Sequence, residues 1–288
     1  MEAVLALGVR PGRIVYANPC KPEAHLRYAA AAGVNLATYD SEEEVAKVAR
    51  CHPGCELLLR VKAPAVDASG APAARFDLGT KYGAHAGEVA PLLLAARRAG
   101  VRVAGVSFHV GSGADRVGVY RGAVEAARAA FDAAAALGGV VPPMRVLDVG
   151  HFGGDGDLDV IGEPGRYLAE TAFTLAARVI GKRRRGEVRE YWIDDGIYGS
   201  LNVVNTDHYV PRPKPLLLSS SSATSTGHDV FGPTCDSLDT VVTGYQLPEM
   251  SVGDWLVFPN MGAYTTALAS NFNGFGIDHI NTYVAYSN

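Results

Sequence analysis

The chain has little of several features that define broad classes of protein. Its four cysteines, Cys20, Cys51, Cys55 and Cys235, are too few and too scattered for a disulfide framework. Cys51 and Cys55 also lack the second ligand pair of a structural zinc site. No apolar run reaches membrane-spanning length, and residues 1–13 are too short and too acidic for a secretory signal. We therefore expect reduced thiols, no metal, no membrane partner and a cytoplasmic location.

An excess of positive charge is missing as well. The formal net charge is -4 at pH 7, which gives no basic surface for nucleic acid or anionic lipid. Hydrophobic residues make up 48% of the 288 residues, enough to bury a large core. The length suits one barrel-sized domain or two smaller ones.

The first two thirds of the chain alternate between two kinds of segment. Short apolar or β-branched runs alternate with Ala-rich stretches of helical period such as residues 118–137, a pattern typical of β/α units around a parallel sheet. Six runs are visible, at residues 13–17, 35–39, 56–62, 101–109, 145–149 and 158–161. The commonest closed form at this size has eight strands, so residues 1–170 predict an incomplete β/α barrel. Residues 171–288, rich in β-formers and turns, predict an antiparallel β domain.

Polar residues and glycines follow the predicted barrel strands. In β/α barrels the carboxyl ends of the strands carry the functional residues. Here these ends hold Arg60, His109 with Ser112, Gly150–Gly154, and Glu163 with Arg166. Glycine backbone N–H groups and an arginine suit a phosphate, so Gly150–Gly154 with Arg166 indicate a phosphate-binding loop. Tight turns between strand and loop account for the glycines equally well.

Five motifs in order resemble a known family. VYANPCK (15–21), SFHVGSG (107–113), EPGRY (163–167), FGPTCDSLD (231–239) and FPNMGAY (258–264) are similar to eukaryotic ornithine decarboxylase, most of all the plant enzymes. The resemblance implies an alanine-racemase-type (β/α)8 barrel with a C-terminal β domain and pyridoxal 5'-phosphate as cofactor. It also implies a homodimer, or a heterodimer with a full-length decarboxylase, in which two active sites are shared.

The resemblance assigns roles around the cofactor. His109 would stack on the pyridine ring, and Glu163 would pair with the protonated ring nitrogen, which makes the ring an electron sink. The other cofactor-binding residues would be Arg60, Ser112, Gly150, Gly153, Gly165, Arg166 and Tyr264. Three alternatives stay open at this point: a strand-end salt bridge between Glu163 and Arg166, a solvated strand end for Arg60, and a core or interface position for Tyr264.

The resemblance also assigns a substrate site. Cys235 would protonate the intermediate, with Glu163 and His109 as the other catalytic residues. Asp207 and Asp236 would bind the distal ammonium group of the substrate. Two carboxylates facing a cation suit a diamino acid, so ornithine, converted to putrescine in polyamine biosynthesis, is expected before lysine. As an isolated residue, Cys235 would read as a small buried hydrophobic side chain.

Two departures from the family pattern bear on activity. The family's cofactor-anchoring lysine lies in a segment like Tyr-Ala-Val-Lys upstream of everything here, and no counterpart occurs, so we expect an N-terminally truncated chain that is inactive as written. Only residues 151–157 lie between Gly150 and the next strand, too few for a crossover helix. Two other readings are a non-catalytic regulator like the antizyme inhibitors and a decaying gene product that does not fold stably.

Overall fold

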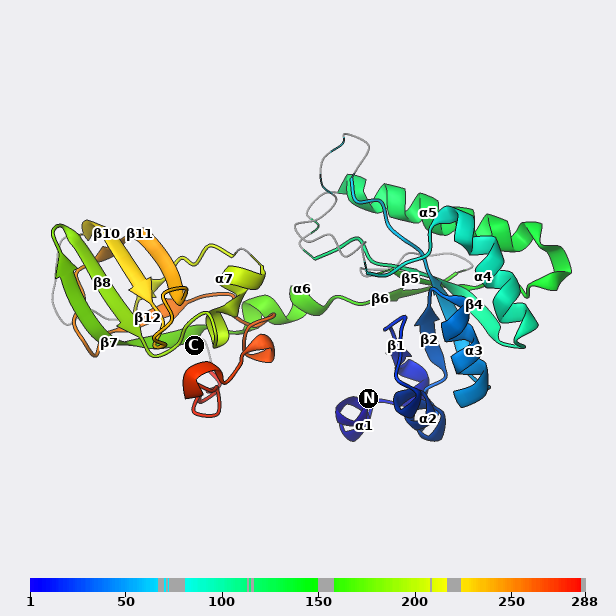
Figure 1. Ribbon diagram of the computed structural model, residues 1–288, viewed down its shortest axis with the longest axis horizontal. Coiled ribbons are helices and arrows are strands. Elements are labelled where there is room, and N and C mark those ends of the chain that lie inside the picture. The colour runs from blue at the N-terminus through cyan, green and yellow to red at the C-terminus, as the bar shows by residue number, and fades with distance from the viewer. Residues whose placement is uncertain are drawn as a thin grey trace. The chain divides into compact units, whose positions relative to one another are not determined.

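The computed structural model describes residues 1–66, 70, 72, 81–112, 114, 117–149, 158–207, 209–216 and 224–285. The chain divides into two compact units, Met1–Pro164 and Gly165–Asn288. Figure 1 labels most of the helices and strands of the two units.

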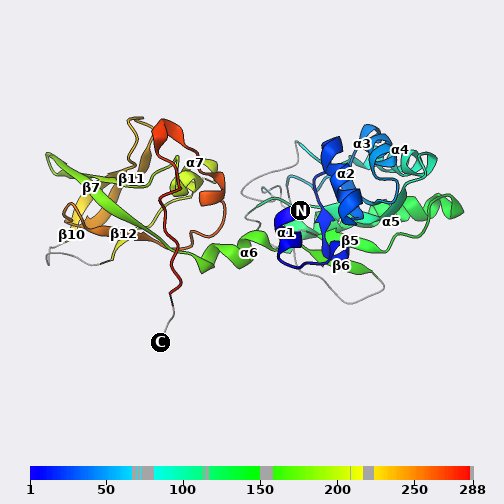
Figure 2. The same cartoon turned by 90° about the horizontal axis from the view of Figure 1, so that it is seen from below.

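The first unit is built on a six-stranded parallel sheet, which confirms the six predicted strands and the incomplete barrel. The strands follow one another in sequence order: β1 (Val15–Tyr16), β2 (Leu36–Tyr39), β3 (Glu56–Arg60), β4 (Arg102–Phe108), β5 (Val146–Val149) and β6 (Asp159–Gly162). The helices are α1 (Glu2–Ala6), α2 (Glu23–Ala32), α3 (Glu42–Cys51), α4 (Ala86–Arg98) and α5 (Val117–Ala136). Helices α2 to α5 pack side by side along the sheet in chain order (Figures 1 and 2).

Strand β3 shows why this sheet is buried. Leu57, Leu58 and Leu59 have no exposed surface, as expected for a strand covered on both faces. Helix α3 begins at Ser41, whose hydroxyl accepts a hydrogen bond from the Glu44 N–H at 3.3 Å. The Ser41–Glu44 spacing predicts a reciprocal capping box. The structure uses Glu44 differently, because its carboxylate forms an ion pair with Lys21.

The connection from β5 to β6 is unusually short. The two strands are parallel neighbours, with Val146 opposite Asp159 and Val149 opposite Gly162. Only residues 150–158 join them, whereas a parallel crossover usually takes a dozen or more residues and carries a helix. The connection is therefore as short as the sequence spacing predicts, and residues 150–157 lie outside the described residues.

The second unit is a six-stranded sheet with the order β11-β10-β8-β7-β12-β9. Its elements are α6 (Gly165–Ala169), β7 (Leu175–Arg185), β8 (Val188–Ile193), α7 (Val203–Thr206), β9 (Lys214–Pro215), β10 (Thr224–Phe231), β11 (Thr240–Pro248) and β12 (Trp255–Phe258). The prediction of an antiparallel domain is wrong for one pair, because β8 and β10 run parallel. The long segment between them, residues 194–223, gives the chain enough length to return to the same end of the sheet.

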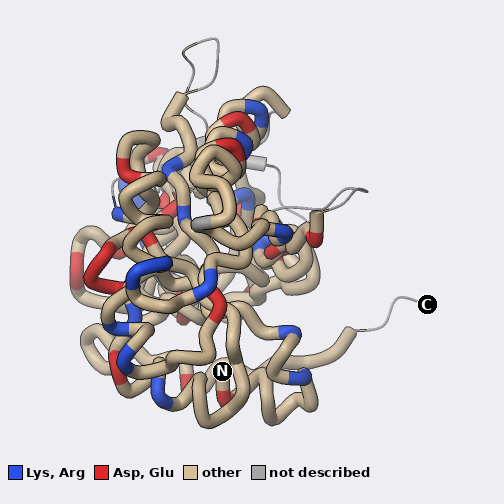
Figure 3. The backbone as a smooth tube through the Cα atoms, turned by 90° about the vertical axis from the view of Figure 1, so that its right-hand side faces the viewer, with Lys and Arg blue, Asp and Glu red and all other residues tan. Residues whose placement is uncertain are grey.

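Residues that carry positive and negative charge are intermixed along the described backbone (Figure 3). The basic run Lys182–Arg185 lies within strand β7 and not in the loop between two strands, where the sequence pattern suggests it. Its members pair with carboxylates such as Glu190, which accepts from Arg183. Among the described residues, no helix is both long enough and apolar enough to cross a bilayer.

Candidate functional site

The carboxyl ends of four neighbouring barrel strands bring polar side chains to one edge of the first unit. Arg60 ends β3 and lies opposite Ser107 of β4, and Ser107 lies opposite Asp148 of β5. The Ser107 hydroxyl donates to Asp148 Oδ2 at 2.8 Å, and both side chains are buried. Glu163 follows β6 directly. The strand ends therefore form a cluster of one arginine and two carboxyl groups.

The charges in this cluster act on one another. Partial desolvation and the nearby Asp148 carboxyl raise the pKa of Glu163, while Arg60 opposes the rise. Burial raises the pKa of Asp148, against the hydrogen bond from Ser107 and the charge of Arg60. Two buried atoms of the cluster, Arg60 Nε and Asp148 Oδ1, have no hydrogen-bond partner among the described residues. These two atoms, at the carboxyl ends of β3 and β5, could each form a further hydrogen bond to a bound group.

The loop after β4 places the predicted ring-stacking histidine at the same edge. Half-buried His109 follows the strand, and its Nδ1 accepts from the Gly111 N–H at 2.9 Å. A neutral ring bonded in this way carries its proton on Nε2. Ser112 lies three residues further along. Gly150 and Gly153, predicted for phosphate binding, lie outside the described residues.

The second unit brings three other predicted residues together. Arg166, in helix α6 just after Gly165, forms an ion pair with Asp207 and a longer one, at 3.6 Å, with Glu170. Its guanidinium lies over the ring of Tyr264, 4.7 Å from the centroid. Tyr264 is 47% exposed, so it is not a core aromatic within this unit. In this structure Asp207 is held by an arginine rather than left free for a cationic substrate.

The turn that carries Tyr264 is fixed by its backbone. Asn260 and Tyr264 have positive φ angles of 60° and 58°, which non-glycine residues rarely adopt and which cost about 1–3 kcal/mol each. A Cβ on Gly262 would lie 1.7 Å from the carbonyl oxygen of Ala169, so only glycine fits against α6. The Gly262 N–H donates to the Glu170 carbonyl at 3.1 Å. These constraints hold Tyr264 beside Arg166.

Cys235 and Asp236 lie on a turn after β10. Cys235 is exposed and its sulfur accepts from Asn273 Nδ2 at 3.0 Å, so it is not the small buried hydrophobic residue of the alternative reading. The Tyr198 hydroxyl donates to the Asp236 carboxylate, which lowers the pKa of Asp236. Tyr198 also stacks on Phe272 with ring centroids 4.2 Å apart.

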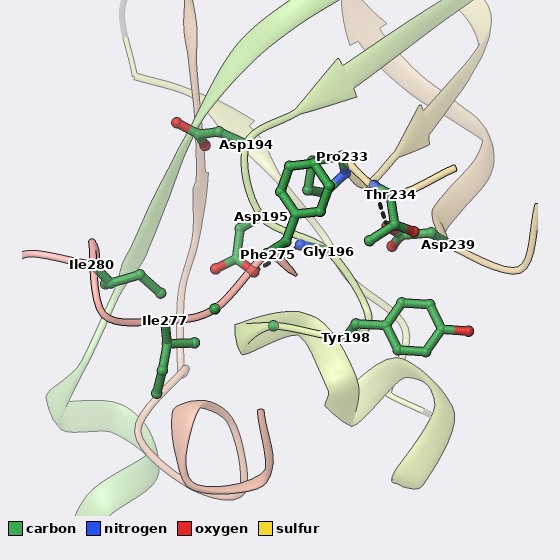
Figure 4. Close-up of a pocket in the computed structure, with 12 residues that line it drawn as sticks. Asp194, Asp195, Gly196, Tyr198, Pro233, Thr234, Asp239, Phe275, Ile277 and Ile280 are labelled. Atoms are coloured by element: carbon green, nitrogen blue, oxygen red, sulfur yellow. Dashed lines mark hydrogen bonds between the residues drawn. The ribbon is translucent and has the colours of Figure 1, made fainter. Parts of the chain in front are cut away.

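Sequence reasoning missed the carboxylate that organises this turn. Figure 4 shows Asp239 beside Thr234, in a pocket shared with Asp195 and Tyr198. Asp239 accepts from the Ile197 N–H at 2.9 Å and from the Thr234 N–H and hydroxyl at 3.1 and 2.7 Å. It thereby ties the segment bearing Tyr198 to the turn bearing Cys235. Its position in FGPTCDSLD was the available signal.

Asp148 was missed as well, and its burial makes a testable prediction about pH. A carboxyl whose pKa is higher in the folded protein than the usual ~3.9 destabilises the fold at neutral pH, and this penalty fades as the pH falls toward that value. We expect Asp148→Asn to raise the melting temperature at pH 7, because the amide oxygen can still accept from Ser107. The gain should shrink as the pH approaches 4 in thermal melts. Asp159→Asn, at the exposed start of β6, is the matched control, and an equal gain in both variants contradicts the assignment.

Comparison with known proteins assigns the family. The pyridoxal-binding domain of the pyridoxal-dependent decarboxylases matches residues 1–156, more than half of the chain. The chain belongs to this family. It is 52% identical over 316 aligned positions to the chloroplastic ornithine decarboxylase of Nicotiana glauca, covering 100% of this chain and 71% of that protein. The resemblance to plant ornithine decarboxylases is thereby confirmed, and the chain is ornithine-decarboxylase-like.

Two further relatives widen the picture. Antizyme inhibitor 2 of Xenopus laevis is 39% identical over 315 positions, covering 96% of this chain and 67% of that protein. The crystal structure of the arginine decarboxylase of Paramecium bursaria Chlorella virus bound to agmatine matches with a TM-score of 0.87 and 33% identity, covering 96% of this chain and 78% of that one. The decarboxylase fold therefore extends over both units.

The alignment with the Nicotiana protein also bears on the short crossover. It spans 316 positions for the 288 residues of this chain, which leaves about 28 positions occupied only in the relative. Because the whole chain is aligned, these gaps are internal. The short connection between β5 and β6 is one place where such a gap would fit.

Proposed function

We propose that this protein forms a pyridoxal-phosphate site of the ornithine decarboxylase type, with L-ornithine as the preferred substrate. The observation that carries the proposal is the cluster at the strand ends of the first unit, where Glu163 lies near Arg60 and Asp148. The cluster fits the cofactor because it offers a carboxylate for a cationic ring nitrogen. It also leaves Arg60 Nε and Asp148 Oδ1 without partners among the described residues.

Pyridoxal phosphate, when bound, withdraws the electrons left on an amino acid as CO2 departs. Glu163 would keep a proton on the ring nitrogen, and His109 would cover the ring. The residues proposed for the phosphate are Ser112, Gly150 and Gly153 in the first unit, and Gly165, Arg166 and Tyr264 in the second. Cys235, exposed on its turn, would deliver a proton to the substrate carbon.

The substrate preference follows from charge. Hydrogen bonding from Tyr198 lowers the pKa of Asp236, which keeps this carboxylate ionised to bind a distal ammonium group. Asp207 would add a second carboxylate once substrate competes with Arg166 for it. Lysine differs from ornithine by one methylene and is the alternative substrate. The test compares kcat/KM for ornithine with kcat/KM for lysine in an active dimer. A difference of one methylene changes this value by about 10–200-fold.

Covalent attachment of the cofactor is not expected for the 288 residues. Lys21 is buried in an ion pair with Glu44, and half-buried Lys62 follows β3, where the family has no anchoring lysine. We therefore expect saturable, reversible binding of pyridoxal phosphate, measured by equilibrium dialysis, with no cofactor retained after borohydride reduction and denaturation. Glu163→Gln and Arg60→Met should each weaken binding about tenfold or more, as loss of a charge-assisted bond does. Absence of saturable binding would refute the proposed site.

A regulatory role is the second candidate, because antizyme inhibitor 2 is 39% identical over 96% of this chain. A regulator should associate with a decarboxylase or with the proteins that bind it, without contributing to turnover. We also propose that the protein dimerises and that it is located in the cytoplasm. Sedimentation tests the dimer. A fluorescent fusion tests the location, which needs a test because the Nicotiana relative is chloroplastic by name.

A further inference from the structure

Lys21 is a buried cation in the segment between β1 and α2, outside the residues assigned to the cofactor. Its Nζ lies 2.8 Å from Glu44 Oε1, and both side chains are buried, at 0% and 2% exposure. Bringing two charges out of water costs several kcal/mol per ion, so such a pair contributes little net stability. A buried pair of this kind calls for a structural reason.

The remaining contacts of Lys21 supply that reason. Its ammonium donates to the carbonyl oxygens of Thr38 at 2.6 Å, Asn18 at 3.1 Å and Pro19 at 3.3 Å. Asn18 and Pro19 form the loop that leaves β1, and Thr38 belongs to β2. Lys21 therefore fastens the β1 loop to the neighbouring strand, with Glu44 of helix α3 compensating its charge.

Arg60 rests on the same loop. Its guanidinium donates to the carbonyl oxygen of Ala17 at 3.2 Å, one residue before Asn18. Among the described residues, the Ala17 carbonyl accepts the only hydrogen bond that the Arg60 side chain donates, and Arg60 is 8% exposed. The position of this carbonyl therefore orients the arginine that acts on Glu163 and Asp148.

We propose that the Lys21–Glu44 pair is a positioning device for Arg60: it fixes the β1 loop so that the Ala17 carbonyl holds the guanidinium at the rim. Lys21 is not among the residues assigned to the cofactor or the substrate, and it acts through the loop. The inference deepens the proposed function, since Arg60 is one of the residues assigned to the cofactor. Its central claim, the coupling of Lys21 to Arg60, does not depend on what binds at the rim.

The test measures the orientation of Arg60 first without cofactor. Because Arg60 Nε is buried, its N–H should give a slowly exchanging proton–nitrogen signal by NMR, assigned by its disappearance in Arg60→Met. Lys21→Met should shift this signal and speed its exchange with water, and Lys21→Arg should restore part of it. Lys47→Met is the matched control: Lys47 also pairs with Glu44, at 2.6 Å, but is more exposed and contacts no loop carbonyl in the described structure. An unchanged Arg60 signal in folded Lys21→Met overturns the proposal.

Cofactor affinity then gives an independent readout. Lys21→Met should weaken pyridoxal phosphate binding about fivefold to tenfold in the parent protein and less than about twofold in Arg60→Met, because a positioning residue acts only through its target. Equal losses in both backgrounds contradict the coupling. If Lys21→Met does not fold, Glu44→Gln, which keeps the volume and removes the charge, takes its place in both measurements. Failure of the parent protein to bind cofactor counts against the proposed function, whereas the NMR result still decides the positioning role.

Discussion

Mixing this protein with an inactive ornithine decarboxylase should restore decarboxylation. The partner would be the Nicotiana glauca enzyme with the cysteine equivalent to Cys235 replaced by alanine, so that it keeps its lysine and loses its proton donor. If the two chains form the shared-site dimer of the proposed function, Cys235 of this chain would complete one site. A positioned general acid contributes about 10²–10⁴-fold, so the release of CO2 from ornithine should rise well above that of either protein alone.

Two controls make the mixing result specific. This chain alone should release no CO2, because none of its lysines matches the anchoring position of the family. Its Cys235→Ala variant should form the mixed dimer and restore nothing. If the proteins associate without activity, the regulatory reading is favoured, and if they do not associate, both the shared site and the regulator lose their support.

Removal of Asp239 should be the most damaging single change in the second unit. Its carboxylate accepts from the Ile197 N–H and from both donors of Thr234, and its side chain is 1% exposed. Asp239→Ala leaves these donors unpaired next to a cavity, at a cost of about 3–5 kcal/mol, comparable to breaking a buried charged network. Thermal melting should show a large loss. The Cys235 thiol should also react faster with a disulfide reagent in whatever folded protein remains, because its turn is released.

Graded variants separate this role from general destabilisation. Asp239→Asn keeps one carbonyl oxygen and should show a smaller loss. Asp194→Ala changes an exposed neighbour in the same pocket, whose carboxylate accepts only from the Arg178 N–H in the described structure, and should stay close to the parent protein. Equal melting temperatures for Asp239→Ala and Asp194→Ala would exclude Asp239 as the organiser of this turn.

Local pattern was enough to predict the sheet of the first unit. All six runs became strands because a parallel sheet covered on both faces demands continuous apolar segments such as Leu57–Leu59, and this signal is visible without tertiary information. The parallel pairing of β8 with β10 was not predictable in this way. The position and direction of a strand in a mixed sheet depend on the path of the long segment that precedes it. This path produces no periodic pattern in the sequence.

The motifs name candidate site residues, but they do not predict which side chains those residues contact. Arg166 lies against both Asp207 and Tyr264 in the structure, but the ion pair between Arg166 and Asp207 joins residues far apart in the chain, and no sequence pattern predicts it. Asp148 and Asp239 escaped notice because a single acid within an apolar strand or turn looks ordinary until its burial is known. The Ser41–Glu44 spacing predicts that Glu44 caps its own helix, yet its carboxylate pairs with Lys21, which lies before helix α2, and with Lys47.

The short link between β5 and β6 affects how firmly Glu163 is held. Strand β6 lies at the edge of its sheet. In the described structure it pairs only with β5, through four pairs of opposed residues. Edge elements with few partners open locally at low free energy, well before the whole domain unfolds. A ligand that binds Glu163 would therefore also stabilise the pairing of β6 with β5. Local opening of this sheet edge should become rarer as the ligand site fills.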